Sequence, residues 1–164
     1  MPSSPLRARS AATVALVAAT LTALAGCGGG GNGDDYAATW NGACRDLKQA
    51  QTRFVDEAQR LVPRQGGDPK ALARQLRKPI DTLAEAREKA LRRIRDADAP
   101  DEFSDFQDET AKAADDAIEQ VQTIKRRVRD GDVTGNVRMT ATRFPSLPAD
   151  LAKKAEACRS GTGL

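Results

Sequence analysis

The fold is decided by residues 36–61, YAATWNGACRDLKQAQTRFVDEAQRL, in which apolar side chains return every three or four positions. This spacing puts them on one face of an α-helix. We therefore predict an amphipathic helix over about residues 36–62, ended by Pro63 and the glycines after it and capped by Asp34 or Asp35. The apolar face consists of Tyr36, Trp40, Cys44, Leu47, Ala50, Phe54, Ala58 and Leu61.

The same pattern predicts three further helices. The first covers about 68–97 and keeps its apolar phase across Pro79, where we expect a kink or a short break. The second covers about 101–130, with Gly131 as its C-cap, and the last covers about 148–158. The sequence thus predicts an all-α fold, an up-down helical bundle of about four helices. The apolar face of the helix over 68–97 consists of Leu72, Leu76, Ile80, Leu83, Ala90 and Ile94.

Residues 1–26 have the organisation of a secretory signal peptide. Arg7 and Arg9 precede an apolar run over 11–25, and no acidic residue lies before that run. The run is shorter than the roughly twenty residues that a membrane-spanning helix needs. Export is therefore the prediction, and an unprocessed membrane anchor is the alternative.

The signal ends on Leu24-Ala25-Gly26-Cys27, which resembles the lipobox of bacterial lipoproteins. The resemblance implies that a diacylglyceryl group is attached to the sulfur of Cys27 and that the chain is cut just before this residue. Two or more acyl chains anchor a protein stably, so the predicted location is the extracytoplasmic face of the cell membrane. The alternative is an ordinary secretory signal with a coincidental cysteine.

The Ala/Arg-rich composition and the cysteines of the first and last helices also resemble small, mostly uncharacterised helical lipoproteins of high-G+C bacteria. The glycine-rich stretch after Cys27 is predicted to be a flexible linker, reaching about 28 Å over residues 28–35 when fully extended. The chain then divides into a signal peptide (1–26), a lipidated cysteine with its linker (27–35), a helical bundle domain (36–159) and a disordered tail (160–164).

Cys44 and Cys158 remain as an even pair once the lipid has taken Cys27. Disulfides persist outside the cytoplasm, and each of these cysteines falls on a predicted apolar face. We predict that they are bonded, with their Cα atoms within about 7 Å. The last helix would then run antiparallel to the first. A loop of this length corresponds to about 4–5 kcal/mol of stabilisation in the chain-entropy treatment.

The composition argues against nucleic-acid binding and against catalysis. The chain has 26 Lys and Arg against 23 Asp and Glu, and loss of Arg7 and Arg9 with the signal leaves 24 against 23. It has no histidine, which is the commonest general base and metal ligand. The doublet Asp115-Asp116 does not converge, because neighbours on a helix point in different directions. We predict no enzymatic activity, no cofactor and no metal.

A basic patch is the one surface feature that the topology predicts. Antiparallel helices bring the start of the second helix to the end of the third, at the pole away from the linker. Such a patch could bind an anionic envelope polymer, lipid headgroups or an acidic protein, and ordinary solvated helix ends are the alternative. The predicted patch consists of Arg74, Arg77, Lys78, Lys125, Arg126, Arg127 and Arg129.

These features predict a membrane-anchored, non-enzymatic binding or scaffolding module whose partner the sequence does not identify. A second hypothesis is a carrier of an apolar ligand, held between helices near Trp40 and Pro79. An enzyme of unidentified class is a third. An apolar cavity of a few hundred cubic ångströms favours the carrier, whereas a filled core favours the first hypothesis.

Overall fold

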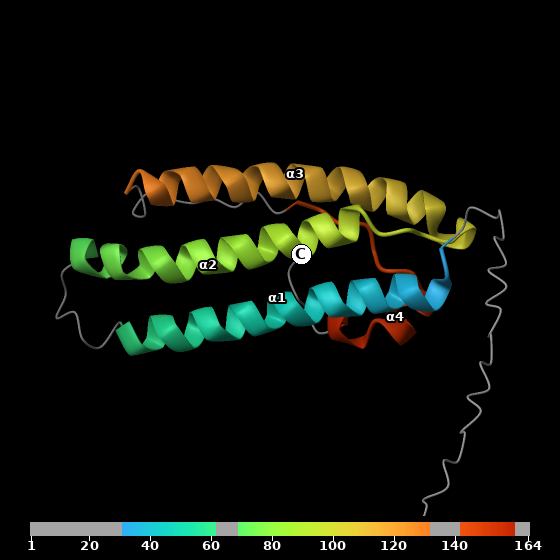
Figure 1. The fold of residues 1–164 in the computed structure, drawn as a ribbon, viewed down its shortest axis with the longest axis horizontal. Helices are drawn as coiled ribbons and strands as arrows, with labels where there is room; N and C mark the ends of the chain where they lie inside the picture. The colour runs from blue at the N-terminus through green and yellow to red at the C-terminus, as the bar shows by residue number, and fades with distance from the viewer. Residues whose placement is uncertain (1–30, 62–68, 132–141, 160–164) are drawn as a thin grey trace, which may run out of the picture.

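The computed structural model describes residues 31–61, 69–131 and 142–159, and most of them are helical (Figure 1). No strand occurs in these ranges, so the prediction of an all-α bundle is confirmed. The elements are the long helices α1 (Gly33–Leu61), α2 (Pro69–Arg95) and α3 (Ser104–Arg129), the short helix α4 (Ala149–Lys154), and the 3-10 turns η2 (Asp101–Phe103) and η3 (Glu156–Cys158).

The three long helices run antiparallel in chain order, and α2 lies between α1 and α3 (Figure 1). Because α2 has a long helix on each side, it needs two apolar faces. Ala90 and Ile94 pack into the cluster shared with α1, whereas Ala84 and Leu91 pack into the cluster shared with α3. The prediction of a single apolar stripe on this helix was therefore incomplete, since it left out the fully buried Leu91.

The first helix begins earlier than predicted. Asn32 Oδ1 accepts a hydrogen bond from the backbone N–H of Asp34 at 3.0 Å, and its carbonyl accepts one from Tyr36 at 2.9 Å. Asn32 is thus the capping residue, a role that its short polar side chain suits. Asp34 and Asp35 lie within the first helical turn instead, where negative charge is favourable. The predicted linker therefore ends before Gly33.

The second and third helices follow the prediction closely. α2 continues through Pro79, so the short break considered for this position is absent. An internal proline removes one backbone hydrogen bond, and α2 at the same time packs against both α1 and α3. Gly131 follows α3 with a φ of 85°, a conformation that favours glycine and marks the helix end. Residues 1–30, 62–68, 132–141 and 160–164 lie outside the described ranges.

The prediction for the last segment was wrong in its direction. Lys154 Nζ lies 2.6 Å from Asp34 Oδ1, and the N–H of Ala157 donates to Asn41 Oδ1 at 2.9 Å. Later residues thus meet later residues of α1, so α4 and η3 run parallel to α1. The helix also ends at Lys154 rather than at Cys158.

The physical reason is the extended segment 142–148, which already carries the chain back along the bundle. Gln120 Nε2 donates to Thr142 Oγ1 at 2.9 Å, midway along α3. Phe144 then packs against the α2–α3 cluster and Leu147 against the α1 cluster. Extended chain advances about 3.3 Å per residue, against 1.5 Å in a helix, so the return is complete before α4 begins.

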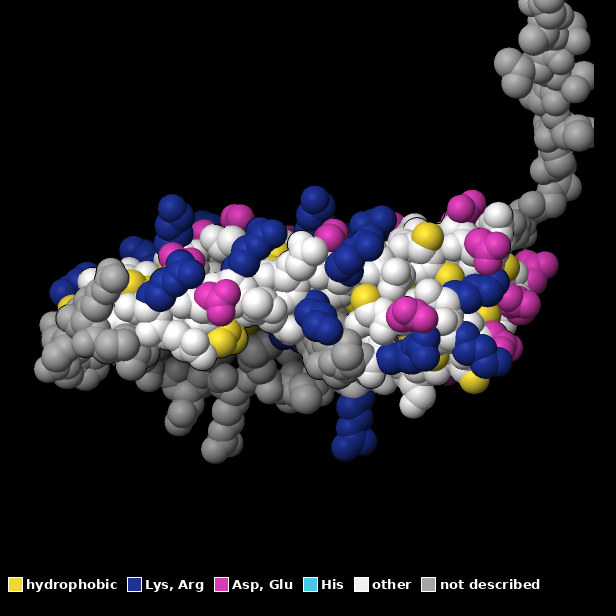
Figure 2. All heavy atoms as spheres, turned by 90° about the horizontal axis from the view of Figure 1, so that it is seen from below, with side chains coloured by type: hydrophobic (Ala, Val, Ile, Leu, Met, Phe, Trp, Pro, Cys, Tyr) yellow, Lys and Arg dark blue, Asp and Glu magenta, His cyan; other side chains and the backbone are white. Residues whose placement is uncertain are grey.

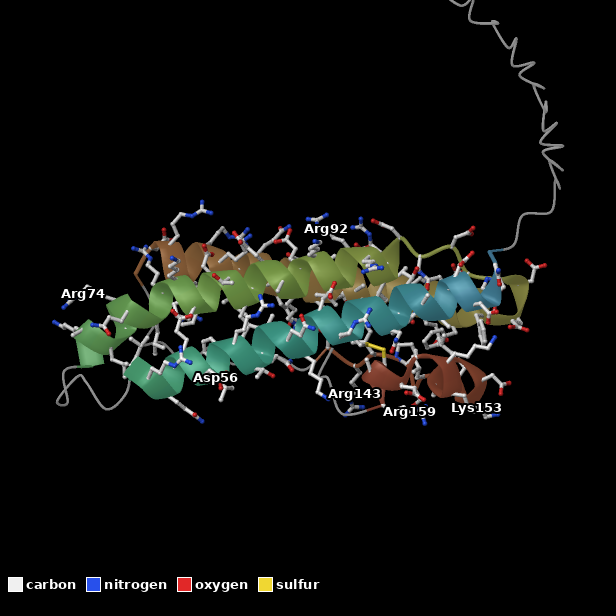
Figure 3. All side chains as sticks on the ribbon, turned by 60° about the horizontal axis from the view of Figure 1, so that its bottom comes forward. Asp56, Arg74, Arg92, Arg143, Lys153 and Arg159 are labelled. Atoms are coloured by element: carbon white, nitrogen blue, oxygen red, sulfur yellow. A yellow bond between two sulfur atoms is a disulfide. The ribbon has the colours of Figure 1, made fainter. Side chains whose placement is uncertain are left out.

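The predicted disulfide is present. Cys44 and Cys158 are bonded, with their Cα atoms 5.2 Å apart (Figure 3). Leu151 and Ala155 are buried against the same part of α1. The C-terminal segment is therefore fixed to the first half of α1 by a covalent bond, by apolar packing and by two polar contacts.

Candidate functional site

A groove lies between α1 and α2, with a volume of about 370 Å³. One face of each helix lines it. The lining residues are Ala43, Asp46, Gln49, Ala50, Arg53, Phe54 and Glu57 of α1, and Pro79, Thr82, Leu83, Ala86, Lys89, Ala90 and Arg93 of α2. The volume lies near the lower end of the range for small-molecule sites.

The groove exists because its floor is built from small side chains. Ala43 and Ala50 of α1 face Ala86 and Ala90 of α2, and alanine fills little of the space between two helix backbones. In the described ranges, α3 and α4 pack elsewhere, on the far side of α2 and on the first half of α1. Among the described residues, α1 and α2 alone line this hollow.

The two ends of the groove differ in chemistry. Phe54, Leu83 and Pro79 line the end towards the α1–α2 turn, where one cation, Arg53, and one carboxylate, Glu57, lie on the rim. Lys89 and Arg93 line the other end and lie on the rim, together with Asp46. Arg93 Nη1 is 3.7 Å from Asp46 Oδ2, and both side chains are about half exposed, at 47% and 58%. An exposed pair at this distance contributes little to stability.

Gly42 determines where Arg93 lies. A Cβ atom at Gly42 would come within 3.0 Å of both terminal nitrogens of the Arg93 guanidinium. The absence of a side chain at Gly42 therefore lets the guanidinium rest directly on α1. This contact places a positive charge at one end of the groove.

Trp40 is not part of the groove, although the carrier hypothesis placed the cavity near Trp40 and Pro79. Pro79 lines it, but Trp40 is 98% buried in the core, with its ring centroid 5.4 Å from that of Phe106. Tyr36 stacks on Phe103 with a centroid separation of 5.7 Å. These aromatic contacts close the end of the bundle that carries the start of α1.

A buried polar contact in this closed end was not anticipated from the sequence. The Tyr36 hydroxyl donates to Gln107 Oε1 at 2.7 Å. Gln107 Nε2 in turn donates to the carbonyls of Ile94 and Arg95, at 2.9 Å each, and so satisfies the end of α2. Burial raises the pKa of Tyr36 above its ordinary 10.0. The sequence offers one signal for this contact, since Gln107 lies one helical turn from both Phe103 and Thr110.

The predicted basic patch is present as a location but is smaller than expected. The start of α2 does lie at the end of α3, because Arg77 Nε donates to the carbonyl of Val128 at 2.8 Å. Arg77 thus satisfies a helix end. Lys125 Nζ lies 3.3 Å from Glu88 Oε2 and 4.0 Å from Glu85 Oε1, in the seam between α2 and α3. These two cations are engaged within the protein.

The remaining members of the patch lie nearer to solvent. Arg74, Lys78, Arg126 and Arg129 are exposed, and Arg127 is half-buried. Figure 3 shows Arg74 at the end of the bundle opposite Lys153 and Arg159. The predicted patch is thus reduced to a ring of exposed cations around the start of α2 and the end of α3.

Acidic side chains gather at the opposite end of the molecule, as the face in Figure 2 shows. They come from the first turns of α1, η2 and α3, namely Asp34, Asp35, Asp101, Glu102 and Asp105. Lys154 lies against Asp34 and lowers the pKa of this carboxyl below its ordinary 3.8, first through a hydrogen bond. The folded domain therefore has an acidic end and a more basic one.

Other kinds of site receive no support from the part of the chain that the structure describes. Histidine, cysteine, aspartate and glutamate side chains there form no group of three that could ligate a metal ion. None of the described helices combines the length and apolar character of a transmembrane segment. Cys27 and the other lipobox residues lie outside the described ranges.

Comparison with models of known protein families, with curated proteins and with solved structures finds no match for this chain.

Proposed function

We propose that the protein is a lipid-anchored, non-enzymatic binding module of the extracytoplasmic face of the cell membrane, and that the α1–α2 groove is its binding site. The groove is the observation that carries the proposal. It has a floor of small apolar side chains and a rim of exposed charged ones. Concave sites with an apolar lining and a few convergent polar groups are typical of ligand binding.

The anchor in this proposal rests on the lipobox pattern Leu24-Ala25-Gly26-Cys27. The bonded pair Cys44–Cys158 supports it, because such bonds persist outside the cytoplasm. Since α1 begins at Gly33, residues 28–32 reach roughly 17 Å when fully extended. That reach holds the start of α1 within roughly 17 Å of the lipid and leaves the domain free to rotate.

The non-enzymatic character rests on the chemistry of the groove. Asp46 and Glu57 are its carboxylates, and they lie on the exposed rim about three helical turns apart along α1. At that separation they cannot act together on one bond of a substrate. Serine, cysteine and histidine do not occur among the lining residues. Binding without covalent chemistry is the function that this set of side chains supports best.

The anchor is tested by the variant Cys27→Ala. We expect the protein to be released from membranes or to stop maturing, measured by fractionation of cells and by the mass of the mature chain. Unchanged membrane retention with normal processing would remove the anchor from the proposal.

The binding site is tested by filling the groove. Ala50→Trp places a large side chain on the floor, whereas Ala38→Trp adds the same side chain at an exposed position of α1. The lipidated protein and both variants are captured from membranes, and bound proteins and lipids are quantified by mass spectrometry. We expect at least one bound component to be lost with Ala50→Trp and kept with Ala38→Trp. Identical sets from all three proteins would contradict a function for the groove.

A second candidate function is binding of an anionic envelope component by the exposed cations at the ends of α2 and α3. Arg74 and Arg129 are both exposed there. If they bind a polyanion, the affinity should fall steeply with salt. Arg74→Glu with Arg129→Glu should abolish binding to phosphatidylglycerol vesicles, whereas Arg45→Glu with Lys112→Glu should not. Absence of binding at low salt would leave these residues as ordinary solvated helix ends.

A further inference from the structure

The groove between α1 and α2 has a directional character that narrows the chemistry of its ligand. Its positive end is formed by Lys89 and Arg93, which lie one helical turn apart on α2. Asp46 is the carboxylate at that end, so the cations outnumber it. At the other end, Phe54, Leu83 and Pro79 line the groove, and the exposed Arg53 and Glu57 on its rim offset each other in charge. A ligand that matches both ends has a negative group and a hydrocarbon part.

The positive end has capacity for another acceptor. The distance of 3.7 Å between Arg93 and Asp46 is longer than a hydrogen bond. The guanidinium is about half exposed and is held over Gly42, beside the floor of the groove. Arginine presents several N–H donors in a planar fork, which suits a carboxylate or a phosphate group. An anionic headgroup at this end would therefore meet donors already in place.

The dimensions favour one hydrocarbon chain. The groove extends from the level of Ala43 and Arg93 to that of Glu57 and Pro79, on the order of 21 Å along α1. Its volume of about 370 Å³ is small for that length. A long, narrow groove fits an extended acyl chain better than a bulky ring system or a two-chain lipid.

We propose that this groove binds a single-chain anionic amphiphile, such as a free fatty acid or a lysophospholipid, with its negative group at Lys89 and Arg93. The hydrocarbon chain lies on Ala50 and Ala86 and ends against Phe54, Leu83 and Pro79. This inference rests on the proposed binding function of the groove and adds the class of ligand and its orientation.

The test uses the lipid-anchored chain in phosphatidylcholine vesicles with photoactivatable probes. The probes are palmitic acid and palmityl alcohol, each with a diazirine near the end of the chain, and a lysophosphatidic acid with the same chain. We expect both anionic probes to label peptides that carry Phe54 and Leu83 more strongly than the alcohol does. The ratio of labelling by palmitic acid and by lysophosphatidic acid distinguishes the two sources of the anionic group.

Three variants test whether labelling depends on the two cations and on the open groove. Lys89→Gln with Arg93→Gln should lower labelling by the anionic probes about tenfold, as expected for the loss of charge-assisted hydrogen bonds, and should leave labelling by the alcohol unchanged. Lys112→Gln, at an exposed position of α3, should change neither. Ala50→Trp should abolish labelling by all three probes.

Two results would overturn the inference. Equal labelling by acid and alcohol, unaffected by Lys89→Gln with Arg93→Gln, would show that the site does not select a negative group, while the binding function of the groove would stand. No labelling of either peptide, with concentration-dependent dimers lost on Ala50→Trp, would show that a second copy of the chain occupies the groove. Failure of the proposed function itself is seen separately, in the comparison of captured components between Ala50→Trp and Ala38→Trp.

Discussion

The two halves of α1 have the same helical periodicity but very different surroundings. In the first half, Tyr36, Trp40, Cys44 and Leu47 are almost completely buried. In the second half, Phe54, Ala58 and Leu61 are only half-buried, and Val55 is 48% exposed. The apolar stripe is continuous along the helix, so the difference lies in what packs against it. α2 packs along both halves, and side chains of η2, of α3 and of the C-terminal segment additionally cover the first half.

This difference separates stability from binding within one helix. A half that is closely packed and tied by a disulfide stabilises the fold, although the indole N–H of Trp40 is buried there without a hydrogen-bond partner among the described residues. A half that is packed on one side leaves apolar surface in a groove where a ligand could contact it. The groove overlaps the end of the closed half (residues 36–47) at Ala43 and Asp46, and follows the open half (residues 48–61) to Glu57.

Removal of the disulfide should cause the largest loss of unfolding free energy, and it should loosen the closed half of α1 and the segment bonded to it. The bond joins residues separated by 114 positions, for which the chain-entropy treatment gives about 4–5 kcal/mol. We expect Cys44→Ser with Cys158→Ser to lose about that much free energy of unfolding in urea. Hydrogen exchange should increase first in α4 and η3. Earlier loss of protection in the contact between α2 and α3 would contradict the assignment.

Two aromatic truncations compare the halves directly. Trp40→Ala removes a buried side chain and should cost about 3–5 kcal/mol of unfolding free energy. Phe54→Ala removes a half-buried one that lines the groove and should cost roughly 1 kcal/mol. Both values come from urea unfolding of the two variants under the same conditions. Equal losses would mean that the second half of α1 is as well packed as the first.

The polar contact in the closed half should give an intermediate effect. Tyr36→Phe leaves the buried Gln107 Oε1 without its donor, which should cost about 1–3 kcal/mol. Burial raises the pKa of Tyr36 in the folded state. The stabilisation that the neutral side chain gives to the fold is therefore complete below pH 10.0 and is lost as the pH rises through the raised pKa. Alkaline unfolding of Tyr36→Phe should lack that loss. An unchanged stability at neutral pH would show that water replaces the donor.

The smallest effect concerns Glu88, in the seam between α2 and α3. Hydrogen bonds from Arg92, helped by Lys125, hold the pKa of Glu88 below its ordinary 4.5. Because this pKa is lowered in the folded state, ionised Glu88 stabilises the fold above pH 4.5. This stabilisation is lost as the pH falls through the lowered pKa. We expect Glu88→Gln to flatten the acid dependence of stability by less than about 1 kcal/mol. A steeper dependence in the variant would contradict this sign.

The sequence predicted the features that depend on periodicity alone. The spacing of Trp40, Cys44 and Leu47 placed them on one helical face, and the position of Cys158 on another apolar face indicated the disulfide. The direction of α4 could not be predicted in the same way. It depends on how far the extended residues 142–148 carry the chain, and periodicity contains no information about length in space.

The groove shows a second limit of periodicity. Periodicity predicts that an apolar position such as Ala50 or Ala86 is buried, because it contains no information on whether another helix covers that position. Leu91 was missed for the related reason that a helix between two others needs two apolar faces. Gln107 was missed because its partners, Tyr36 and the end of α2, are distant in sequence. The groove, the burial of Leu91 and the contacts of Gln107 all depend on which helices pack side by side.

Native-state hydrogen exchange along α1 tests the central claim most directly, since it compares the two halves within one helix. We predict that amides from about Trp40 to Leu47 exchange only through opening that approaches global unfolding, and that those from about Phe54 to Leu61 exchange through much less costly local opening. Addition of a ligand that fills the groove should slow exchange in the second half more than in the first. Uniform protection along α1, with or without ligand, would contradict the division into a closed and an open half.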